Sequence, residues 1–465
     1  MFGEASNTEI DVSIMPVGDF NSKITVMLAG GTDIDVIWNM GPTNAGMYDI
    51  IEQGAFLALD DYLAEYPAVK EAIDQTTWDT QVSSDGKHYF FPNALAVFVP
   101  FPIYYREDVF EELGIAIPTT MDEFTDALRA IKAGKPDMIP FTHSSLTSEW
   151  YFQNIYAAYG YSHGWQPDPN DPTRIIPGVI TDEYKEALSW LHLLRVEGLI
   201  DPDSMIAQGK RGSDTFKAGE AAVLCINWDS YLDLKTNLVK NVPTGTINIL
   251  PPMKGPKGVT AAKNLTGYDR GYSINVASKD KAEDIFKFLN WAFTDGYDIN
   301  RYGFEGKTYT VTPEGVKVGI PDDEREPDFV RANVEPMQFG LKSADTMPDW
   351  QARALSFQKA GLTIEEVDIM RRGFEESIAN YIPDYDRFVY TPTRAAKNDG
   401  LNADYLTPAY QKVMIDPAAG IEVYEAAIEQ WLANGGQQII DEVNEAQKDK
   451  TAPVFKWEYT GPDYH

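Results

Sequence analysis

The chain has 465 residues, which is more than one ordinary hydrophobic core accommodates, so we expect two lobes or domains. Apolar residues make up 43% of the chain and aromatic residues 12%, a composition typical of an ordered globular protein. The 39 basic and 71 acidic residues give a net charge of -32. Nucleic acids and anionic lipids are bound by basic patches, so we expect neither as a partner, and a neutral or cationic ligand is favoured.

The sequence lacks the common catalytic and metal-binding motifs. Cys225 is the one cysteine, which excludes a disulfide within the chain and a cysteine-based metal cluster; its apolar neighbours predict a buried side chain. The five histidines show no HExxH spacing, and no G-x-S-x-G sequence is present. We therefore expect no catalytic residue, no metal and no cofactor. Acidic residues are so numerous that some carboxylates must meet, and a glycosidase pair stays open as the alternative.

The first elements are predicted near the N-terminus. Residues 9–16 alternate as a strand, residues 20–28 have the apolar spacing of a helix, and residues 35–38 form a short apolar strand. Strand, helix and strand in this order predict a βαβ unit, whose ligands bind at the carboxyl ends of the strands. Trp38 and Asn39 lie at such an end and are candidate ligand-binding residues; packing in the core is the alternative for Trp38.

A proline-rich stretch follows a predicted turn at residues 85–87. Residues 88–105 are apolar and aromatic but contain Pro92, Pro100 and Pro102. Proline removes a backbone donor and is therefore rare in central strands. We expect these residues to form an edge strand or a segment that crosses between two lobes.

A helix with a specific N-terminal cap is predicted after this stretch. Pro118 ends an extended segment, and Thr120 followed three residues later by Glu123 is the pattern of a capping box. The apolar side chains that follow recur at a helical spacing, at Phe124, Leu128 and Ile131. The pattern predicts a helix with one buried apolar face.

The residues around this helix carry a family resemblance. They read YYRED at 104–108, LGI at 113–115 and PTTMDEF at 118–124. This pattern resembles a signature of the family 1 extracellular solute-binding proteins, the carbohydrate-capturing components of bacterial ABC importers. Two later sequences match the same family pattern, GLIDPD at 198–203 and FKAGEAAV at 216–223.

The resemblance implies an α/β fold with two lobes, of the type II periplasmic-binding-protein class, and a ligand cleft between the lobes. The chain of such proteins passes between the lobes at several hinge crossings, which we expect near Tyr104, Arg270 and Met337. The expected N-terminal lobe comprises residues 1–104 and 271–336. The expected C-terminal lobe comprises residues 105–270 and 337–465, with the terminal helices.

A cluster of aromatic residues begins at residue 150. The sequence SEWYF at 148–152 resembles the segment with which maltose-type binding proteins stack against and hydrogen-bond their sugar. The resemblance implies that Glu149 binds sugar hydroxyls and that Trp150 or Tyr151 stacks on a sugar ring. The alternative is a helix that uses its rings for core packing, because apolar residues recur at helical spacing at Phe152, Ile155 and Tyr159.

The sequence DPNDPT at 168–173 lies where alginate-binding relatives have a calcium loop. It departs from that pattern, since Pro172 stands where an oxygen ligand is needed and the turn glycine is missing. We therefore interpret these residues as an Asx and proline turn.

A second tryptophan is predicted at the end of a strand. A helix that begins after Thr181 is predicted before this strand. The apolar face of the helix consists of Tyr184, Ala187, Leu188, Leu191 and Leu194. Gly219 fits a turn that ends a helix before a strand at residues 221–226. This strand carries Trp228 at its carboxyl end, and the resemblance implies that Trp228 is a stacking residue.

Residues 264–275, NLTGYDRGYSIN, join a loop to a strand predicted from Gly271. Tyr268, Asp269 and Arg270 lie together within this stretch. Aromatic rings cover the apolar face of a sugar while a carboxylate and a guanidinium bind its hydroxyls, so a polyhydroxylated ligand is one interpretation. The other is a buried ion pair at the entrance to the strand, with rings that pack in the core.

The last third of the chain is predicted to contain several helices. Residues 282–293, 351–380 and 421–447 have helical spacing. The apolar stripe of the last helical region is expected at Val423, Ala426, Ala427, Gln430 and Trp431. The sequence GKT at 306–308 is no phosphate loop, because Arg301 stands where that loop needs glycine.

The resemblance implies that the protein captures an oligosaccharide between its lobes and delivers it, as a monomer, to the permease subunits of an ABC transporter. A carbohydrate-active hydrolase with paired cleft carboxylates is the alternative, and a cleft protein for peptides or another polar solute is the third interpretation. No segment approaches the roughly 20 apolar residues of a membrane span, and no signal peptide precedes Phe2. The resemblance implies an extracellular protein whose precursor has a secretion signal and a lipidated cysteine ahead of residue 1.

Overall fold

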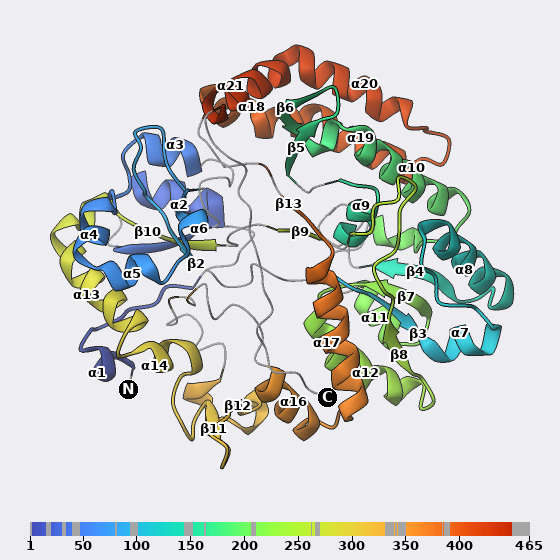
Figure 1. Ribbon diagram of the computed structural model, residues 1–465, viewed down its shortest axis with the longest axis horizontal. Helices are drawn as coiled ribbons and strands as arrows, with labels where there is room; N and C mark the ends of the chain where they lie inside the picture. The colour runs from blue at the N-terminus through green and yellow to red at the C-terminus, as the bar shows by residue number, and fades with distance from the viewer. Residues whose placement is uncertain are drawn as a thin grey trace.

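The computed structural model describes residues 2–14, 20–29, 34–39, 47–79, 81–93, 101–143, 152–161, 164–205, 211–261, 263–265, 270–330, 339, 342, 350–383, 385 and 391–448. The fold is α/β with two lobes, as predicted, and each lobe is built around its own sheet. The N-terminal lobe lies at the left of Figure 1 and the C-terminal lobe at the right.

Among the residues described, the sheet of the N-terminal lobe has three antiparallel strands. Their order is β1 (Val36–Asn39), β10 (Arg270–Ile274) and β2 (Phe91–Asn93), so segments far apart in the sequence lie side by side. Gly271 of the central strand pairs with Asn39 on one side and with Pro92 on the other. A Cβ atom at Gly271 would lie 2.1 Å from the carbonyl oxygen of Phe91, which explains why glycine stands here.

Helices cover this sheet and bury apolar side chains against it. Helix α13 (Ala282–Phe293) has the predicted bounds, and Phe286, Leu289 and Phe293 on it are buried. The other helices are α1 (Phe2–Ser6), α2 (Phe20–Ala29), α3 (Met47–Glu52), α4 (Asp60–Glu65), α5 (Pro67–Glu71), α6 (Gln75–Asp79) and α14 (Tyr297–Tyr302). A hairpin of β11 (Tyr309–Val311) and β12 (Lys317–Gly319) follows α14.

Two predictions for the N-terminal region are wrong. Residues 8–14 form no strand, and Ile14 is 75% exposed, because alternating apolar residues make a strand only where a neighbouring strand supplies hydrogen bonds. The βαβ interpretation is wrong as well, since β1 pairs with β10 and the pairing is antiparallel. Helix α2 and strand β1 themselves are confirmed.

The sheet of the C-terminal lobe has the strand order β4 (Ile139–His143), β7 (Ala221–Cys225), β3 (Ile103–Arg106) and β8 (Ile247–Ile249). Strands β4 and β7 are parallel, and the other pairs are antiparallel. Tyr105 and Val223 belong to one apolar cluster, whereas their neighbours Tyr104 and Leu224 belong to another. The sheet is therefore buried on both faces, which explains the continuous apolar sequence of β7.

The proline-rich segment before this sheet is partly as predicted. Strand β2 is an edge strand, but β3 is a central strand with neighbours on both sides. Pro102 comes directly before β3, so every residue within the strand keeps its backbone donor.

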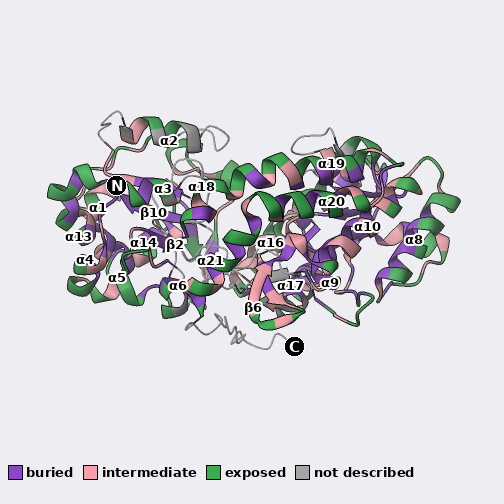
Figure 2. Ribbon diagram, turned by 90° about the horizontal axis from the view of Figure 1, so that it is seen from above, coloured by how far each residue is buried: buried purple, intermediate pink, exposed green. Residues whose placement is uncertain are grey.

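The predicted helices of the C-terminal lobe are confirmed. Helix α8 (Met121–Gly134) begins with the capping box of Thr120 and Glu123, and α10 (Asp182–Val196) begins after the N-cap Thr181. The other elements are α7 (Glu107–Leu113), α9 (Gln153–Ala158), α11 (Arg211–Lys217), α12 (Tyr231–Asn241) and the hairpin of β5 (Trp165–Asp168) and β6 (Asp171–Pro177). In Figure 2, α8 and α13 lie near opposite ends of the molecule, with exposed residues on their outer faces.

The helical region predicted at 351–380 consists of two helices, α16 (Trp350–Lys359) and α17 (Ile364–Ala379). Thr363 and Glu366 form a second capping box at the start of α17, and this local cap separates the two helices. Helices α18 (Pro392–Leu401) and α19 (Thr407–Ile415) follow and were not expected from the sequence.

The final helical region contains α20 (Glu422–Trp431) and α21 (Gln437–Gln447), joined by one π-helical turn. Its predicted apolar stripe is wrong at Ala426 and Gln430, which are exposed. Tyr424 and Ile428 are buried in their place, because the face that packs against the C-terminal lobe is centred on these larger side chains.

Strand β9 (Lys263–Leu265) pairs in parallel with β13 (Tyr381–Pro383), and both lie near the centre of Figure 1. Phe339 packs on Tyr272 and Phe288 of the N-terminal lobe, with ring centroids 4.9 and 5.0 Å away. Trp350 packs in the C-terminal lobe, so the chain passes from one lobe to the other between Phe339 and Trp350. Met337 lies outside the described residues, and the boundaries of the lobes stay predictions.

Candidate ligand-binding site

The structure describes only part of the predicted site. Glu149, Trp150, Tyr151, Tyr268 and Asp269 lie outside the described residues. Trp38 and Asn39 lie in the N-terminal lobe, Trp228 lies in the C-terminal lobe, and Arg270 is described through its backbone. Phe152, Ile155 and Tyr159 are buried, so these side chains pack in the core.

Strand pairing brings Trp38, Asn39 and Arg270 to the same part of the N-terminal sheet. Asn39 lies opposite Gly271, the residue after Arg270. Asn39 is 1% exposed, and its side-chain amide donates to the hydroxyl oxygen of Ser273 at 3.1 Å. This bond joins β1 to β10, so the Asn39 amide stabilises the sheet, while Trp38 is half-buried beside it.

Trp228 lies in the turn that follows β7, as predicted. It is 6% exposed, because the rings of Trp350 and Phe374 pack on it at 65° and 68°, with ring centroids 5.6 and 5.0 Å away. The guanidinium carbon of Arg353 lies 4.7 Å from the centroid of the Trp228 ring. Helices α16 and α17 therefore enclose the indole and fix its orientation.

The hydroxyl group of Tyr104 holds the backbone that carries Trp228. It donates toward the carbonyl oxygens of Trp228, at 2.6 Å, and Asn227, at 3.1 Å. Burial, together with the nearby charge of Asp229, raises the pKa of Tyr104 well above its ordinary value, so the hydroxyl stays protonated and donates. Strand β3 thereby positions the turn after β7.

The remaining residues of the YYRED sequence hold β3 in place. Arg106 is 3% exposed and donates to Asp108 through Nε at 2.8 Å and Nη2 at 2.5 Å. Burial of Asp108 opposes its ionisation, but the hydrogen bonds and charge of Arg106 outweigh this effect and hold the pKa of Asp108 below its ordinary value. Tyr105 packs on Phe110 with ring centroids 4.6 Å apart. The sequence that carries the family resemblance is therefore structural, and it acts on the site through Tyr104.

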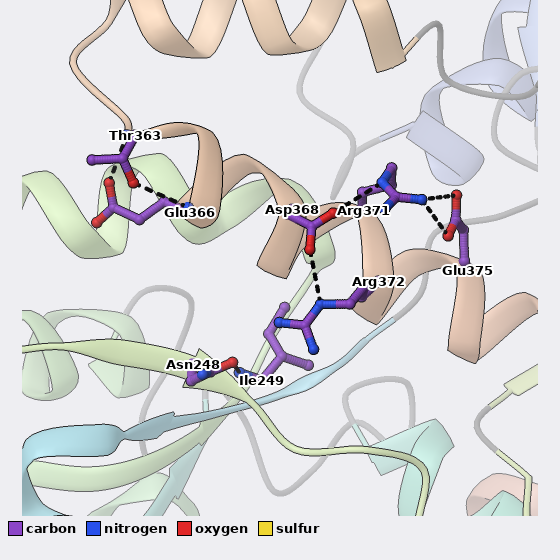
Figure 3. Close-up of polar contacts among 8 residues, drawn as sticks. All are labelled: Asn248, Ile249, Thr363, Glu366, Asp368, Arg371, Arg372 and Glu375. Atoms are coloured by element: carbon purple, nitrogen blue, oxygen red, sulfur yellow. Dashed lines mark hydrogen bonds and ion pairs between the residues drawn. The ribbon is translucent and has the colours of Figure 1, made fainter. Parts of the chain in front are cut away.

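Figure 3 shows the polar contacts that hold helix α17, beginning with the reciprocal cap of Thr363 and Glu366. Charged side chains then pair along the helix: Asp368 with Arg371 and Arg372, and Arg371 with Glu375. A Cβ atom at Gly373 would come within 2.8 Å of the side chain of Ile249 on β8. The absence of this atom lets α17 lie close to β8, and the next residue, Phe374, then contacts Trp228.

Sequence reasoning missed Trp350, Arg353 and Phe374 beside Trp228. Trp350 and Arg353 are three residues apart, a spacing that places both on one side of a helix. A helix predicted from residue 351 leaves Trp350 out, and no local signal connects these residues to Trp228 more than a hundred positions earlier.

Comparison with known proteins decides the family. The model of the bacterial extracellular solute-binding proteins matches residues 2–299. The chain belongs to this family. Members of the family are solute-binding proteins rather than enzymes.

Two relatives show what this solute-binding protein resembles in sequence. It is 21% identical over 462 residues to the polygalacturonan/rhamnogalacturonan-binding protein YtcQ of Bacillus subtilis (strain 168). This alignment covers 95% of this chain and 86% of that protein. It is 24% identical over 325 residues to the fructooligosaccharide ABC transporter substrate-binding protein FusA of Streptococcus pneumoniae serotype 4. This alignment covers 62% of this chain and 56% of that protein.

A solved structure shares the fold of this solute-binding protein. The structure of S. pneumoniae FusA in complex with kestose matches it with a TM-score of 0.68 at 19% sequence identity, covering 97% of this chain and 95% of that chain. The two-lobed arrangement is therefore common to both proteins.

Other sequence expectations concern metals and the cysteine. Asp168 accepts a hydrogen bond from the backbone nitrogen of Asn170 at 2.8 Å, which confirms the Asx turn. Within the described ranges, no group of three or more His, Cys, Asp or Glu side chains is placed to hold a metal ion.

Cys225 is fully buried, as predicted, and burial raises the pKa of its thiol. Among the helices that the structure describes, none has the length and apolar character of a membrane crossing.

Proposed function

We propose that this solute-binding protein captures an oligosaccharide between its two lobes and delivers it to an ABC transporter. The observation that carries the proposal is the family assignment, combined with relatives whose names specify polygalacturonan, rhamnogalacturonan and fructooligosaccharide. These ligands differ in charge and in sugar type, but all of them are carbohydrates. The proposed ligand class is therefore an oligosaccharide.

The proposed site combines residues of both lobes. Trp228 stacks on a sugar ring from the C-terminal lobe, Trp38 and Arg270 contact the ligand from the N-terminal lobe, and buried Asn39 holds β1 against β10 beside them. The resemblance adds Glu149, Trp150 and Tyr151, and the pairing of an aromatic ring with charged groups at 268–270 adds Tyr268 and Asp269. A ring that covers about 100 Å² of sugar at roughly 25 cal/mol per Å² contributes about 2.5 kcal/mol. Several such rings with hydrogen bonds offset the cost of association and give about micromolar affinity.

Lobe closure accompanies binding in this proposal. The two lobes move relative to each other about the points where the chain crosses between them. A ligand that contacts both lobes has a higher affinity for the closed arrangement and shifts the equilibrium toward it.

The protein acts as a carrier and leaves its ligand unchanged. It functions as a monomer outside the cell, anchored through a lipidated cysteine of its precursor, and its partners are the permease subunits of the transporter. The family resemblance supports this location and these partners. The hydrolase alternative has no support among the relatives compared above, which are named as binding proteins.

Thermal unfolding with a ligand panel, followed by chromatography of the same mixtures, tests the proposal. The panel contains oligogalacturonides as acidic carbohydrates, kestose as a neutral one, and a peptide pool. We expect an increase in Tm with one of the carbohydrates, no increase with peptides, and no new carbohydrate product. Accumulating hydrolysis products favour the hydrolase, and a response to peptides alone favours a peptide-binding protein.

A further inference from the structure

Arg353 covers the ring of Trp228. Its guanidinium carbon lies over the ring, 4.7 Å from the centroid, which is the geometry of a cation–π contact. Arg353 lies about one helical turn after Trp350, which also contacts Trp228. Helix α16 therefore places two side chains on the same indole.

Little of Trp228 is available to a ligand in this arrangement, since the residue is 6% exposed. Trp350 and Phe374 are 3% and 1% exposed and belong to the core of the C-terminal lobe, and Tyr104 holds the backbone of Trp228. Arg353 is half-buried. A long side chain near the surface changes its rotamer readily, whereas a packed ring moves only with its neighbours. Arg353 is therefore the side chain that must move when a sugar stacks on Trp228.

We propose that Arg353 occupies the sugar-binding face of Trp228 in the ligand-free protein and leaves this face when the ligand binds. The inference rests on the proposed function, because it takes Trp228 as a stacking residue. One ring face holds one partner, so the guanidinium group and the sugar compete. The contact lowers the affinity for every ligand and selects those that stack well enough to replace a cation–π contact.

The position of α16 links this contact to the movement of the lobes. Lys359, the last residue of α16, pairs with Glu324 at 2.7 Å, and Glu324 follows the β11–β12 hairpin that comes after α14. Figure 1 shows α16 beside β12. The chain enters α16 after leaving Phe339, which packs on the N-terminal lobe. A movement of the N-terminal lobe reaches α16 through the Lys359–Glu324 pair, and Arg353 is the side chain of this helix that responds while Trp350 stays packed on Trp228.

Isothermal titration calorimetry of the full chain tests the inference. The wild-type protein is titrated with oligogalacturonides and with kestose, and the carbohydrate that binds is then used for Arg353→Ala, Arg353→Gln and Arg301→Ala. The last variant is a matched control, because Arg301 lies over the ring of Tyr302 at 4.9 Å in the N-terminal lobe. We expect both Arg353 variants to bind about three- to tenfold more tightly than wild type, and Arg301→Ala to bind like wild type.

The outcomes separate the inference from the proposed function. If wild type binds a carbohydrate and both Arg353 variants bind it equally or more weakly, the inference is overturned and the proposed function stands. If wild type binds neither carbohydrate, the proposed function is overturned for these ligand classes, together with the inference. Thermal unfolding of each variant shows that it is folded at the temperature of the titration.

Discussion

The hydroxyl group of Tyr104 lies 2.6 Å from the carbonyl oxygen of Trp228. Tyr104 is on β3, in the centre of the C-terminal sheet, and Trp228 follows the neighbouring strand β7. The bond therefore connects the most buried part of this lobe to the residue that we propose as the stacking surface. It also gives the first tyrosine of the YYRED sequence a physical role in the site.

Tyr104→Phe tests this role. The substitution removes the hydroxyl donor from the carbonyl oxygen of Trp228 and leaves the carbonyl oxygen of Asn227 with the backbone nitrogen of Ser230 as its donor, which we expect to lower the free energy of unfolding by about 1–3 kcal/mol. We also expect a carbohydrate affinity about threefold lower, since the turn loses its fixed position. Calorimetry and chemical denaturation measure the two effects.

Tyr231→Phe is the matched control for that substitution. The Tyr231 hydroxyl is also buried and donates to a backbone carbonyl oxygen, that of Ile247 at 3.1 Å. We expect a similar loss of stability and an unchanged affinity. Equal effects of the two substitutions on affinity would show that Tyr104 has no special link to the site.

Trp228→Ala is expected to weaken carbohydrate binding at least about tenfold, because one stacking surface is lost. Since Trp228 packs between Trp350 and Phe374, we also expect a loss of stability of about 3–5 kcal/mol. Trp431→Ala, which removes a buried tryptophan of α20, should destabilise the protein by a similar amount without changing the affinity. Unchanged binding by folded Trp228→Ala protein removes Trp228 from the site.

Local signals in the sequence predicted much of the helical structure. Helices α8 and α10 were predicted from their N-terminal caps and their apolar spacing, and α13 from its apolar spacing alone, and all of these signals are local. Pairing between distant segments was not predictable in this way. The contact of Asn39 with Gly271 joins positions far apart in the chain, and residues 9–14, the described part of the strand expected at 9–16, form no strand.

In the candidate site too, local features were predictable from the sequence and contacts between distant segments were not. Trp228 was placed correctly at the end of its strand, because strand and turn are local features. Its burial by Trp350, Arg353 and Phe374 depends on two helices that come much later in the sequence. Asn39 likewise was predicted at a strand end, but its bond to Ser273 follows only from the pairing of β1 with β10.

Asp108→Asn is expected to lower the free energy of unfolding by about 1–3 kcal/mol at pH 7, because it removes the carboxylate that pairs with buried Arg106. The pKa of Asp108 is lowered in the folded protein, so its stabilising effect is present above the ordinary carboxyl pKa and is lost as the pH falls through the lower folded value.

Chemical denaturation at pH 7 and at pH 3 checks this prediction. The stability difference between wild type and Asp108→Asn should shrink at the lower pH. Asp126→Asn is the control, because Asp126 pairs with Arg129 on an exposed helix surface and should change stability little at either pH. A constant difference at both pH values would contradict the role assigned to the Asp108 charge.

Gly271→Ala is expected to destabilise the N-terminal lobe by about 2 kcal/mol or more. The new Cβ atom would meet the carbonyl oxygen of Phe91 at 2.1 Å and the ring of Phe90 at 2.5 Å, so the strands must separate. Gly319→Ala on β12 is the matched control, since no atom lies within 4 Å of the added Cβ there. Chemical denaturation of both variants should show a lower free energy of unfolding for Gly271→Ala and an unchanged one for Gly319→Ala.

The proposed role of this protein is the stoichiometric capture of a carbohydrate. Isothermal titration of the full chain with oligogalacturonides and with kestose, each at a concentration well above micromolar, measures this capture. We predict one binding site per chain, with about micromolar affinity for one of these ligand classes, and recovery of the ligand unchanged. Absence of binding to both classes, or steady release of cleaved sugar during the titration, would contradict the proposal that this protein is an oligosaccharide carrier.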